Sequence, residues 1–159
     1  MNIKEIFDLR FIKKGVIVSD KGGLFNMMVD DLFNAGIVTS KEIILKALWH
    51  REGDENTGIG KSIAVPHTSY DTYPELEGVV KEMKAVIYIL ARDLDYGSLD
   101  GNPVRIVCLL AEPAGKQAEH LKVLRLISKS LYSQENRDKL MSYKDEQEIL
   151  NFFIGCINE

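Results

Sequence analysis

The sequence predicts an α/β fold in which a single domain forms one mixed β-sheet flanked by α-helices. Two apolar, β-branched runs, residues 86–90 and 104–110, are typical of central strands, and the short turn at residues 100–103 favours antiparallel pairing between them. Amphipathic helical patterns precede and follow these strands. The chain has 159 residues, 45% hydrophobic and 28% charged, so we expect one domain over residues 1–159.

The N-terminal segment predicts a short helix, a brief strand and a longer helix. We expect the short helix over residues 3–9 and the strand over residues 16–18. Ser19 and Asp20 are good helix caps, and Gly36 supplies a C-terminal stop. Between them, five apolar residues share one helical face: Leu24, Met27, Met28, Leu32 and Ala35.

A second helix is predicted to begin at a capping box. Thr39 would be its N-cap and Glu42 would reach back to the N-cap amide. The helix should run toward residues 49–51, and residues 51–56 should form a polar connection.

The remaining elements follow from apolar runs and periodicity. Residues 63–65 predict a buried strand, and a helix should begin at about Ala118. That helix carries four residues on one face: His120, Leu124, Ile127 and Leu131. Asp145 and Glu148 have capping-box spacing and open a final amphipathic helix.

Charge and cysteine content narrow the classes of function. Twenty Lys and Arg against 24 Asp and Glu give a net charge of −4, which argues against nucleic acid or anionic lipid as partners. Cys108 lies inside an apolar run and has no metal-type spacing to Cys156, so both are expected to be reduced thiols. The chain begins without a secretory signal and has no stretch of membrane-spanning length. We expect a soluble, cytoplasmic protein.

The most informative segment runs from Asn56 to His67. Gly58 and Gly60 permit close approach of the backbone, residues 63–65 form the buried strand, and Pro66 fixes φ just before the histidine. This places His67 at a rigid strand end beside backbone amides. The alternative is a histidine that only closes a turn after the strand.

The other two histidines also have alternatives. His50 follows Trp49 near a helix end, where exposed or capping histidines are common. His120 either packs at the edge of the core or lines a site, because it lies in the first turn of its helix beside a glycine-containing loop.

A metal ion, a bound nucleotide and a serine nucleophile are not supported by the motifs. The acidic neighbours Asp71, Asp100 and Glu119 have no convincing ligand spacing to the histidines. A P-loop would need glycine where Glu55 stands, and Ser62 and Ser69 lie in no nucleophile elbow. We therefore expect neither a metal nor a cofactor.

The chemistry that suits His67 is phosphoryl transfer. A histidine with a pKa near 6.5 is mostly neutral at cytosolic pH, so one ring nitrogen can attack while the other donates a hydrogen bond. The protein must also stabilise charge on the phosphoryl oxygens. Candidates for that role are Thr57, Arg51, Gly58, Gly60 and the start of the helix that carries His120.

Taken together, these blocks resemble the EIIA domains of the fructose/mannitol class of the bacterial phosphoenolpyruvate:sugar phosphotransferase system, including their nitrogen-regulatory branch. The resemblance covers nearly the whole chain. It rests on separated blocks in this order: Arg51-Glu52, then Thr57-Gly58-Ile59-Gly60 and Ile63-Ala64-Val65-Pro66-His67, then Asp100-Gly101-Asn102-Pro103-Val104, and finally Glu119-His120-Leu121.

The resemblance implies a mixed sheet flanked by helices and a phosphocarrier activity. His67 matches the histidine that is phosphorylated at Nε2 by HPr or its paralogue, which implies a hydrogen bond at Nδ1. His120 matches a second active-site histidine that steadies the phosphoryl group, and Arg51 matches an arginine near the site. In transport members the phosphate passes to a cysteine of an EIIB domain and then to a sugar entering through the membrane component EIIC.

The resemblance leaves the physiological role open. A transport phosphocarrier without an attached EIIB or EIIC segment is one reading, and a regulator of the nitrogen branch, whose phosphorylation controls binding to protein targets, is another. An inactive scaffold is a third. The sugar cannot be read from this chain, since the membrane component largely selects it.

Two residues depart from the family pattern. The family usually has glycine at the position of Ser62 and a small residue at the position of Thr68, directly after the histidine. The Thr68 hydroxyl is expected either to contact the phosphate or to alter docking of the carrier.

Overall fold

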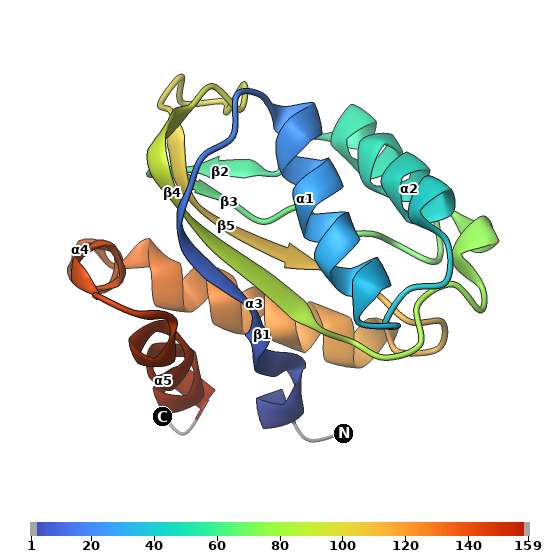
Figure 1. Cartoon of the computed structure of the whole chain (residues 1–159). Coiled ribbons are helices and arrows are strands. Elements are labelled where there is room, and N and C mark those ends of the chain that lie inside the picture. The colour runs from blue at the N-terminus through green and yellow to red at the C-terminus, as the bar shows by residue number, and fades with distance from the viewer. Residues whose placement is uncertain (1–2, 158–159) are drawn as a thin grey trace.

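The computed structural model describes residues 3–157 and contains one five-stranded mixed sheet with the order β1-β4-β5-β3-β2 (Figure 1). The central pair is antiparallel, while β1 runs parallel to β4 and β3 runs parallel to β5. The strands are β1 (Phe7–Val16), β2 (Gly58–Gly60), β3 (Ile63–Ala64), β4 (Ala85–Leu94) and β5 (Val104–Leu110). The predicted α/β class and the antiparallel central pair are both confirmed.

Helices cover both faces of the sheet (Figure 1). Helices α1 (Lys21–Asn34) and α2 (Lys41–Asp54) pack on one face, and α3 (Gln117–Tyr132) and α5 (Glu146–Ile157) pack on the other. The chain also forms a short helix α4 (Gln134–Ser142) and two 3₁₀ turns, η1 (Ile3–Ile6) and η2 (Pro74–Leu76). No helix among residues 3–157 is both long and apolar enough to cross a membrane.

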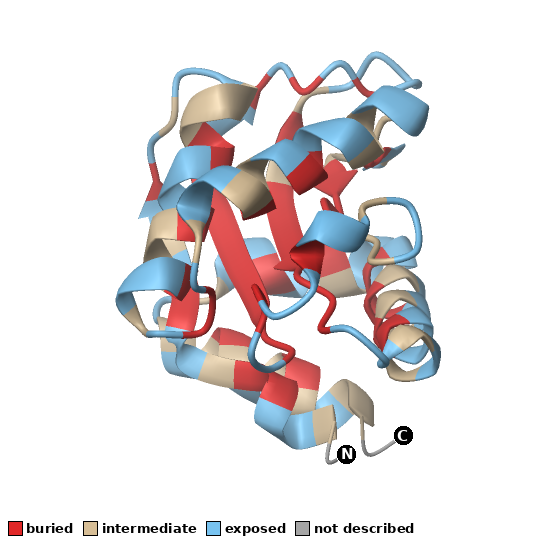
Figure 2. Ribbon diagram, turned by 90° about the vertical axis from the view of Figure 1, so that its right-hand side faces the viewer, coloured by how far each residue is buried: buried red, intermediate tan, exposed pale blue. Residues whose placement is uncertain are grey.

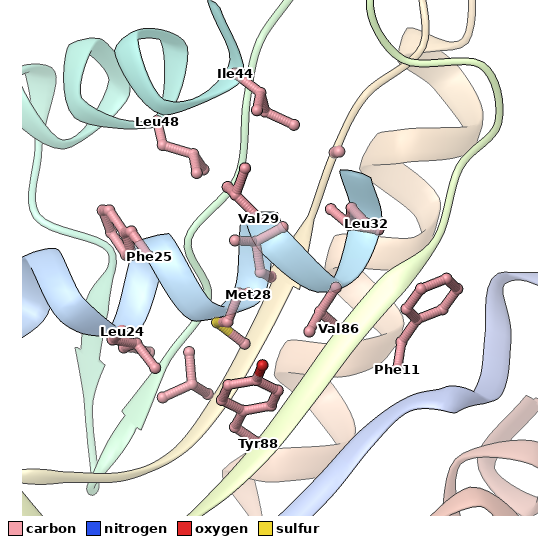
Figure 3. Packing of buried hydrophobic residues seen from close by; sticks show 14 of the residues in the cluster. Phe11, Leu24, Phe25, Met28, Val29, Leu32, Ile44, Leu48, Val86 and Tyr88 are labelled. Carbon is pink, nitrogen blue, oxygen red and sulfur yellow. The ribbon is translucent and has the colours of Figure 1, made fainter. Parts of the chain in front are cut away.

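Strand β4 is apolar along most of its length because both of its faces are buried (Figure 2). Val86, Tyr88 and Leu90 point to the layer of α1 and α2, and the alternating residues Ala85, Ile87 and Ile89 point to the layer of α3 and α5. Figure 3 shows the first of these cores, where α1 side chains meet Val86 and Tyr88. These two cores fix the sheet between the helix layers.

The prediction for residues 3–18 was wrong. Only residues 3–6 form a helical turn, and a ten-residue strand, β1, replaces the predicted helix end and the strand at 16–18. The pairing of β1 with β4 has register shifts between Phe7 and Ile12 and between Lys14 and Val16. These irregularities break the alternation of apolar and polar residues, which is the main sequence signal of a strand.

The ends of α1 are confirmed, whereas the predicted start of α2 is wrong by one residue. Asp20 accepts a hydrogen bond from the Gly23 amide at 2.7 Å and caps α1. Ser40, not Thr39, caps α2 by accepting from the Ile43 amide at 3.2 Å. Glu42 pairs with Lys46 on the exposed helix surface instead of reaching back.

Helix α2 also continues through residues 51–54, which we expected to form a connection. Its buried residues are Ile44, Ala47 and Leu48. The extra turn is what carries Arg51 to the end of the sheet.

The C-terminal helices were predicted in part. Helix α3 buries His120, Ile127 and Leu131 as expected. At α5 the Glu148 amide donates to Asp145 at 3.0 Å, but the Glu148 carboxylate accepts from the Lys144 amide, so the capping box is not reciprocal. Helix α4 was missed.

Helix α4 gives little hydrophobic signal because it buries only Arg137 and Leu140. The Arg137 guanidinium donates to the carbonyls of Leu131 and Tyr132 at the end of α3. A buried arginine that satisfies helix-end carbonyls is not recognisable from a hydrophobic pattern.

The β2–β3 hairpin turns through two non-glycine residues with positive φ. Lys61 has φ 58° and Ser62 has φ 67°, and type I′ hairpin turns require a positive φ at both central residues. In this left-handed region of φ and ψ, a residue with a Cβ is destabilised by about 1–2 kcal/mol. Ser62, which stands where the family usually has glycine, is therefore strained.

We expect Ser62→Gly to raise the free energy of unfolding by about 0.5–1 kcal/mol, because relief of this strain exceeds the extra chain entropy of glycine when unfolded. Urea unfolding measures the change. Ser62→Ala keeps the Cβ and is the matched control, which should show no gain. An equal gain in both variants would contradict the strain argument.

Candidate active site

His67 lies at the edge of the sheet that is formed by the carboxyl ends of β3 and β5, where these two parallel strands end side by side. It directly follows Pro66 after β3 and forms a parallel bridge with Leu110, the last residue of β5. The chain then leaves β5 through residues 111–116 and enters α3, which brings His120 back to the same edge. The two imidazole rings are 5.7 Å apart between centroids.

A cavity of about 430 Å³ opens beside His67 and His120. Its lining comes from α2, the segment after β3, the end of β5 and α3: Arg51, Asp54, Glu55, His67, Ser69, Asp71, Thr72, Glu112, Gln117, His120, Leu121 and Leu124. The structure therefore brings together three of the four residues predicted for the site.

Both ring nitrogens of His67 have defined partners. Nδ1 is 2.9 Å from the Val65 carbonyl oxygen, which can only accept, so Nδ1 carries the proton. The Arg51 Nε–H then donates to the unprotonated Nε2 at 3.1 Å. The two bonds require the same neutral tautomer.

Burial lowers the pKa of His67 below its usual value of 6.5, and the nearby Arg51 charge lowers it further, while the Val65 carbonyl acts in the opposite direction. His67 is therefore neutral at neutral pH. The lone pair on Nε2 is available to an electrophile that displaces Arg51 from it.

Arg51 is held in place by its own helix end. Its Nη1 donates to the Glu55 carbonyl at 2.8 Å. Within residues 3–157, its Nη2 has no hydrogen-bond partner. Once the Nε2 lone pair of His67 forms a bond to an electrophilic group, this guanidinium can turn to anionic oxygens carried by that group.

His120 is buried, and neither of its ring nitrogens has a hydrogen-bond partner among the described residues. Unpartnered buried polar atoms are rare, because each costs free energy unless a ligand or water satisfies it. Burial, with a smaller contribution from His67, lowers the pKa of His120 to about 3. The neutral ring thus offers one N–H donor next to the His67 ring.

The depressed pKa of His120 makes a prediction for stability. The unfolded chain takes up a proton on this residue below about pH 6.5, whereas the folded chain resists it until about pH 3, so stability is lost as the pH falls through that window. Between pH 7.5 and 5.0 we expect His120 to account for about 2 kcal/mol of lost unfolding free energy. Urea unfolding at both pH values should show a correspondingly smaller loss in His120→Gln. An equal loss in the two proteins would contradict the depressed pKa.

Thr57 is not brought to the cavity. Its side chain is buried, and its hydroxyl donates to Glu52 and lies 2.7 Å from the Tyr96 hydroxyl oxygen. The predicted contact of Thr57 with the phosphoryl oxygens is therefore not supported by its position.

Local packing and backbone conformation explain why the motif has glycine at positions 58 and 60. A Cβ on Gly58 would lie 2.1 Å from the Ser98 hydroxyl, and the Gly58 amide already donates to the Asn56 side chain at 2.7 Å. Gly60 has φ 85°. Tight packing and turn geometry, instead of phosphate contact, account for both residues.

Thr68 has a structural role in this chain. It is fully buried, and its hydroxyl accepts a hydrogen bond from the Glu112 amide at 2.9 Å. The Thr68 side chain therefore fastens the segment after His67 to the end of β5. The predicted contact between its hydroxyl and a phosphate is not supported.

Glu112 is a cavity residue that the sequence did not single out. Its carboxylate accepts from the Tyr70 amide at 3.0 Å, while burial and the nearby Asp71 raise its pKa. Asp54, Ser69 and Gln117 were missed as well. The only available signal was their closeness in sequence to Arg51, His67 and His120.

The remaining candidates lie elsewhere. His50 packs edge-on against Tyr73, with ring centroids 5.5 Å apart, and does not line the cavity. Cys108 is buried in β5, where its surroundings raise its thiol pKa to about 12. Within residues 3–157 no three His, Cys, Asp or Glu side chains cluster closely enough to hold a metal ion.

A second cavity, of about 520 Å³, lies between η1, the segment before β4 and the segment before α3. Its charged lining includes Lys81, Lys84 and Lys116, and it contains no histidine. The two adjacent histidines, His67 and His120, therefore line the smaller cavity.

Comparison with known proteins gives the family. The model described as "Phosphoenolpyruvate-dependent sugar phosphotransferase system, EIIA 2" matches residues 5–155. The fructose-specific EIIA component from Haloferax volcanii is 27% identical over 148 residues, which cover 93% of this chain and 92% of that protein. A nitrogen regulatory protein from Bradyrhizobium diazoefficiens is 34% identical over 110 residues, 69% of this chain and 67% of that protein.

A solved structure with the same fold is the complex of enzyme IIAMTL and phosphorylated enzyme IIBMTL from Escherichia coli. The match has a TM-score of 0.77 and 22% identity, and covers 94% of this chain and 99% of that one. Fold and family model agree over nearly the same residues. The chain belongs to the EIIA type 2 family of the phosphoenolpyruvate-dependent sugar phosphotransferase system and is a phosphotransferase component of that system.

Proposed function

We propose that this chain is a cytoplasmic phosphocarrier that accepts a phosphoryl group from phospho-HPr, or a paralogue of HPr, on Nε2 of His67. It then passes the group to a cysteine of an EIIB domain for uptake of a fructose- or mannitol-type sugar. The observation that carries the proposal is the pair of hydrogen bonds made by the His67 ring. Nδ1 donates its proton to the Val65 carbonyl, so the ring lone pair lies on Nε2, where it accepts a hydrogen bond from Arg51.

The accepting step uses groups already in place. The Nε2 lone pair attacks phosphorus, the N–P bond of the donor phosphohistidine breaks, and its electron pair stays on the donor ring. The His67 ring gains positive charge, which the Val65 carbonyl stabilises at Nδ1–H. Arg51 and the N–H of His120 then face the phosphoryl oxygens.

The passing step reverses this exchange. A thiolate attacks phosphorus, the N–P bond breaks, and the electron pair returns to Nε2 of His67. Four carboxylates, from Asp54, Glu55, Asp71 and Glu112, line the same cavity and repel a dianionic phosphoryl group. This repulsion favours transfer over storage. The solved complex with phosphorylated IIB supports an EIIB domain as the acceptor.

A regulatory role is the second candidate. It is supported by the similarity to a nitrogen regulatory protein, 34% identity over 110 residues, which stands beside 27% identity over 148 residues to the fructose-specific component. In this role the phosphorylation state of His67 would control binding to a protein target, and no sugar would receive the phosphate.

Phosphotransfer to EIIB domains separates the two candidates. The chain is labelled with phosphoenolpyruvate, enzyme I and HPr, freed of donor proteins, and mixed with fructose- and mannitol-type EIIB domains. Discharge within seconds by one of them supports the transport role. Retention of the label with all of them rejects that role and favours the regulatory one.

A further inference from the structure

A buried carboxylate, Glu52, lies directly beside Arg51 but is not among the residues that line the cavity. Its side chain is only 5% exposed. Its two oxygens accept hydrogen bonds from the Lys21 ammonium at 2.6 Å, the Thr57 amide at 3.2 Å, the Tyr96 hydroxyl at 3.0 Å and the Thr57 hydroxyl. Four donors satisfy the carboxylate.

The donors come from separate parts of the chain. Lys21 begins α1, Thr57 precedes β2, and Tyr96 follows β4, while Glu52 itself lies in the last turns of α2. The Lys21 ammonium also lies 4.0 Å from the centre of the Tyr96 ring. Burial of a carboxylate is costly unless its charge and lone pairs are matched, and this network matches both.

A continuous path of hydrogen bonds leads from this network to the nucleophile. Glu52 holds Thr57, whose carbonyl accepts from the Val65 amide at 3.0 Å. The Val65 carbonyl then accepts from Nδ1–H of His67 at 2.9 Å. On the other side, Arg51 is bonded through the backbone to Glu52 and donates to Nε2 of His67.

We propose that Glu52 is a positioning residue for phosphoryl transfer, which fixes both partners of the His67 ring without contacting the phosphoryl group. Through Thr57 it sets the carbonyl that selects the Nδ1–H tautomer, and through the end of α2 it sets the position of Arg51. The inference rests on the proposed role of His67 as the phosphate acceptor. It also gives Thr57 a role in the site that needs no contact with phosphate.

Glu52→Gln tests this inference with little change in shape. One acceptor oxygen becomes an NH₂ group that faces donors, and Lys21 loses its counter-charge. We expect the rate of phosphate acceptance to fall ~10–100-fold, as for a misplaced catalytic geometry. We also expect the ¹⁵N signals of the His67 ring to show a mixture of tautomers in place of the single Nδ1–H form.

The double variant Lys21→Met, Glu52→Gln separates positioning from simple stability. It removes the ammonium that Glu52→Gln leaves without a counter-charge, on a side chain that is 16% exposed, and keeps an apolar stem against Phe25 and Tyr96, which should restore the urea midpoint. If Glu52 positions the site, the tautomer mixture and the slow acceptance remain after stability returns. If both recover with stability, the inference is overturned.

Glu42→Gln is the matched control, because Glu42 lies in the first turn of the same helix with its side chain 76% exposed. It should leave the His67 signals and the acceptance rate unchanged. The tautomer measurement needs no phosphate, so it remains decisive about Glu52 even if the wild-type chain accepts none. A single Nδ1–H tautomer in Glu52→Gln overturns the inference, whereas absence of wild-type labelling overturns the proposed function.

Discussion

His67→Gln is expected to abolish labelling of this chain by phosphoenolpyruvate, enzyme I and HPr, to below ~1% of the wild-type rate. Gln keeps a polar side chain of similar reach but has no nucleophilic nitrogen lone pair. We expect neither other histidine to replace it, because His50 packs against Tyr73 outside the cavity and His120, although it lines the cavity, is only 6% exposed.

Quantitative labelling with acid and base lability tests measures this loss. His50→Gln is the control that removes a histidine from outside the cavity, and it should be labelled as fast as the wild type. Urea unfolding verifies that His67→Gln remains folded. Acid-labile label that persists in the folded His67→Gln variant would reject His67 as the acceptor.

Arg51→Met is expected to slow phosphate acceptance ~10²–10³-fold, which is the usual loss when a preorganised donor to developing charge is removed. The variant should also raise the pKa of His67, because the guanidinium charge is one of the causes that lower it. If the pKa of His67 rises toward its ordinary value of 6.5, the rate of phosphate acceptance should begin to fall at a higher pH as the solution is made more acidic.

Rapid-quench labelling across pH 5–8 and ¹⁵N titration of the His67 ring measure both effects. Arg51→Lys keeps the positive charge but lacks the planar Nε–H donor. Compared with Arg51→Met, it should therefore restore the pKa of His67 more fully than it restores the rate of phosphate acceptance. Arg92→Met removes an exposed arginine from β4 and should change neither. Unimpaired acceptance by Arg51→Met would show that the Arg51–His67 contact has no part in transfer.

Much of the site was predictable because its signals are local in the sequence. The strand before His67, the rigid Pro66 and the early position of His120 in an amphipathic helix all follow from short-range patterns. The antiparallel central pair followed from the short turn at residues 100–103. These features specify the edge of the sheet at which the histidines meet.

Features that depend on contacts between distant segments were not predictable. The bond from the Glu112 amide to Thr68 joins residues 44 apart, and the bond from Tyr96 to Glu52 also joins residues 44 apart. A polar residue that bonds across such a distance has the same sequence signature as a surface residue. Thr57 and Thr68 were therefore expected near phosphate, although both hydroxyls are buried in structural bonds.

Strand β1 was also not predictable from the sequence, because its identity depends on pairing with a distant strand. Its two register shifts leave Phe7, Phe11, Ile12 and Val16 buried without regular alternation. The pattern resembles a helix start at one end and a brief strand at the other. Only the pairing partner, β4, reveals that the segment is one strand.

The most direct test of the central role of His67 is the site of phosphorylation within its ring. Heteronuclear NMR of the ¹⁵N-labelled chain, phosphorylated through HPr, can locate the phosphorus by its coupling to a ring nitrogen. The structure predicts coupling to Nε2 of His67, with Nδ1 still protonated and bonded to Val65. Phosphorus on Nδ1 of His67, or on His120 or His50, would contradict the account.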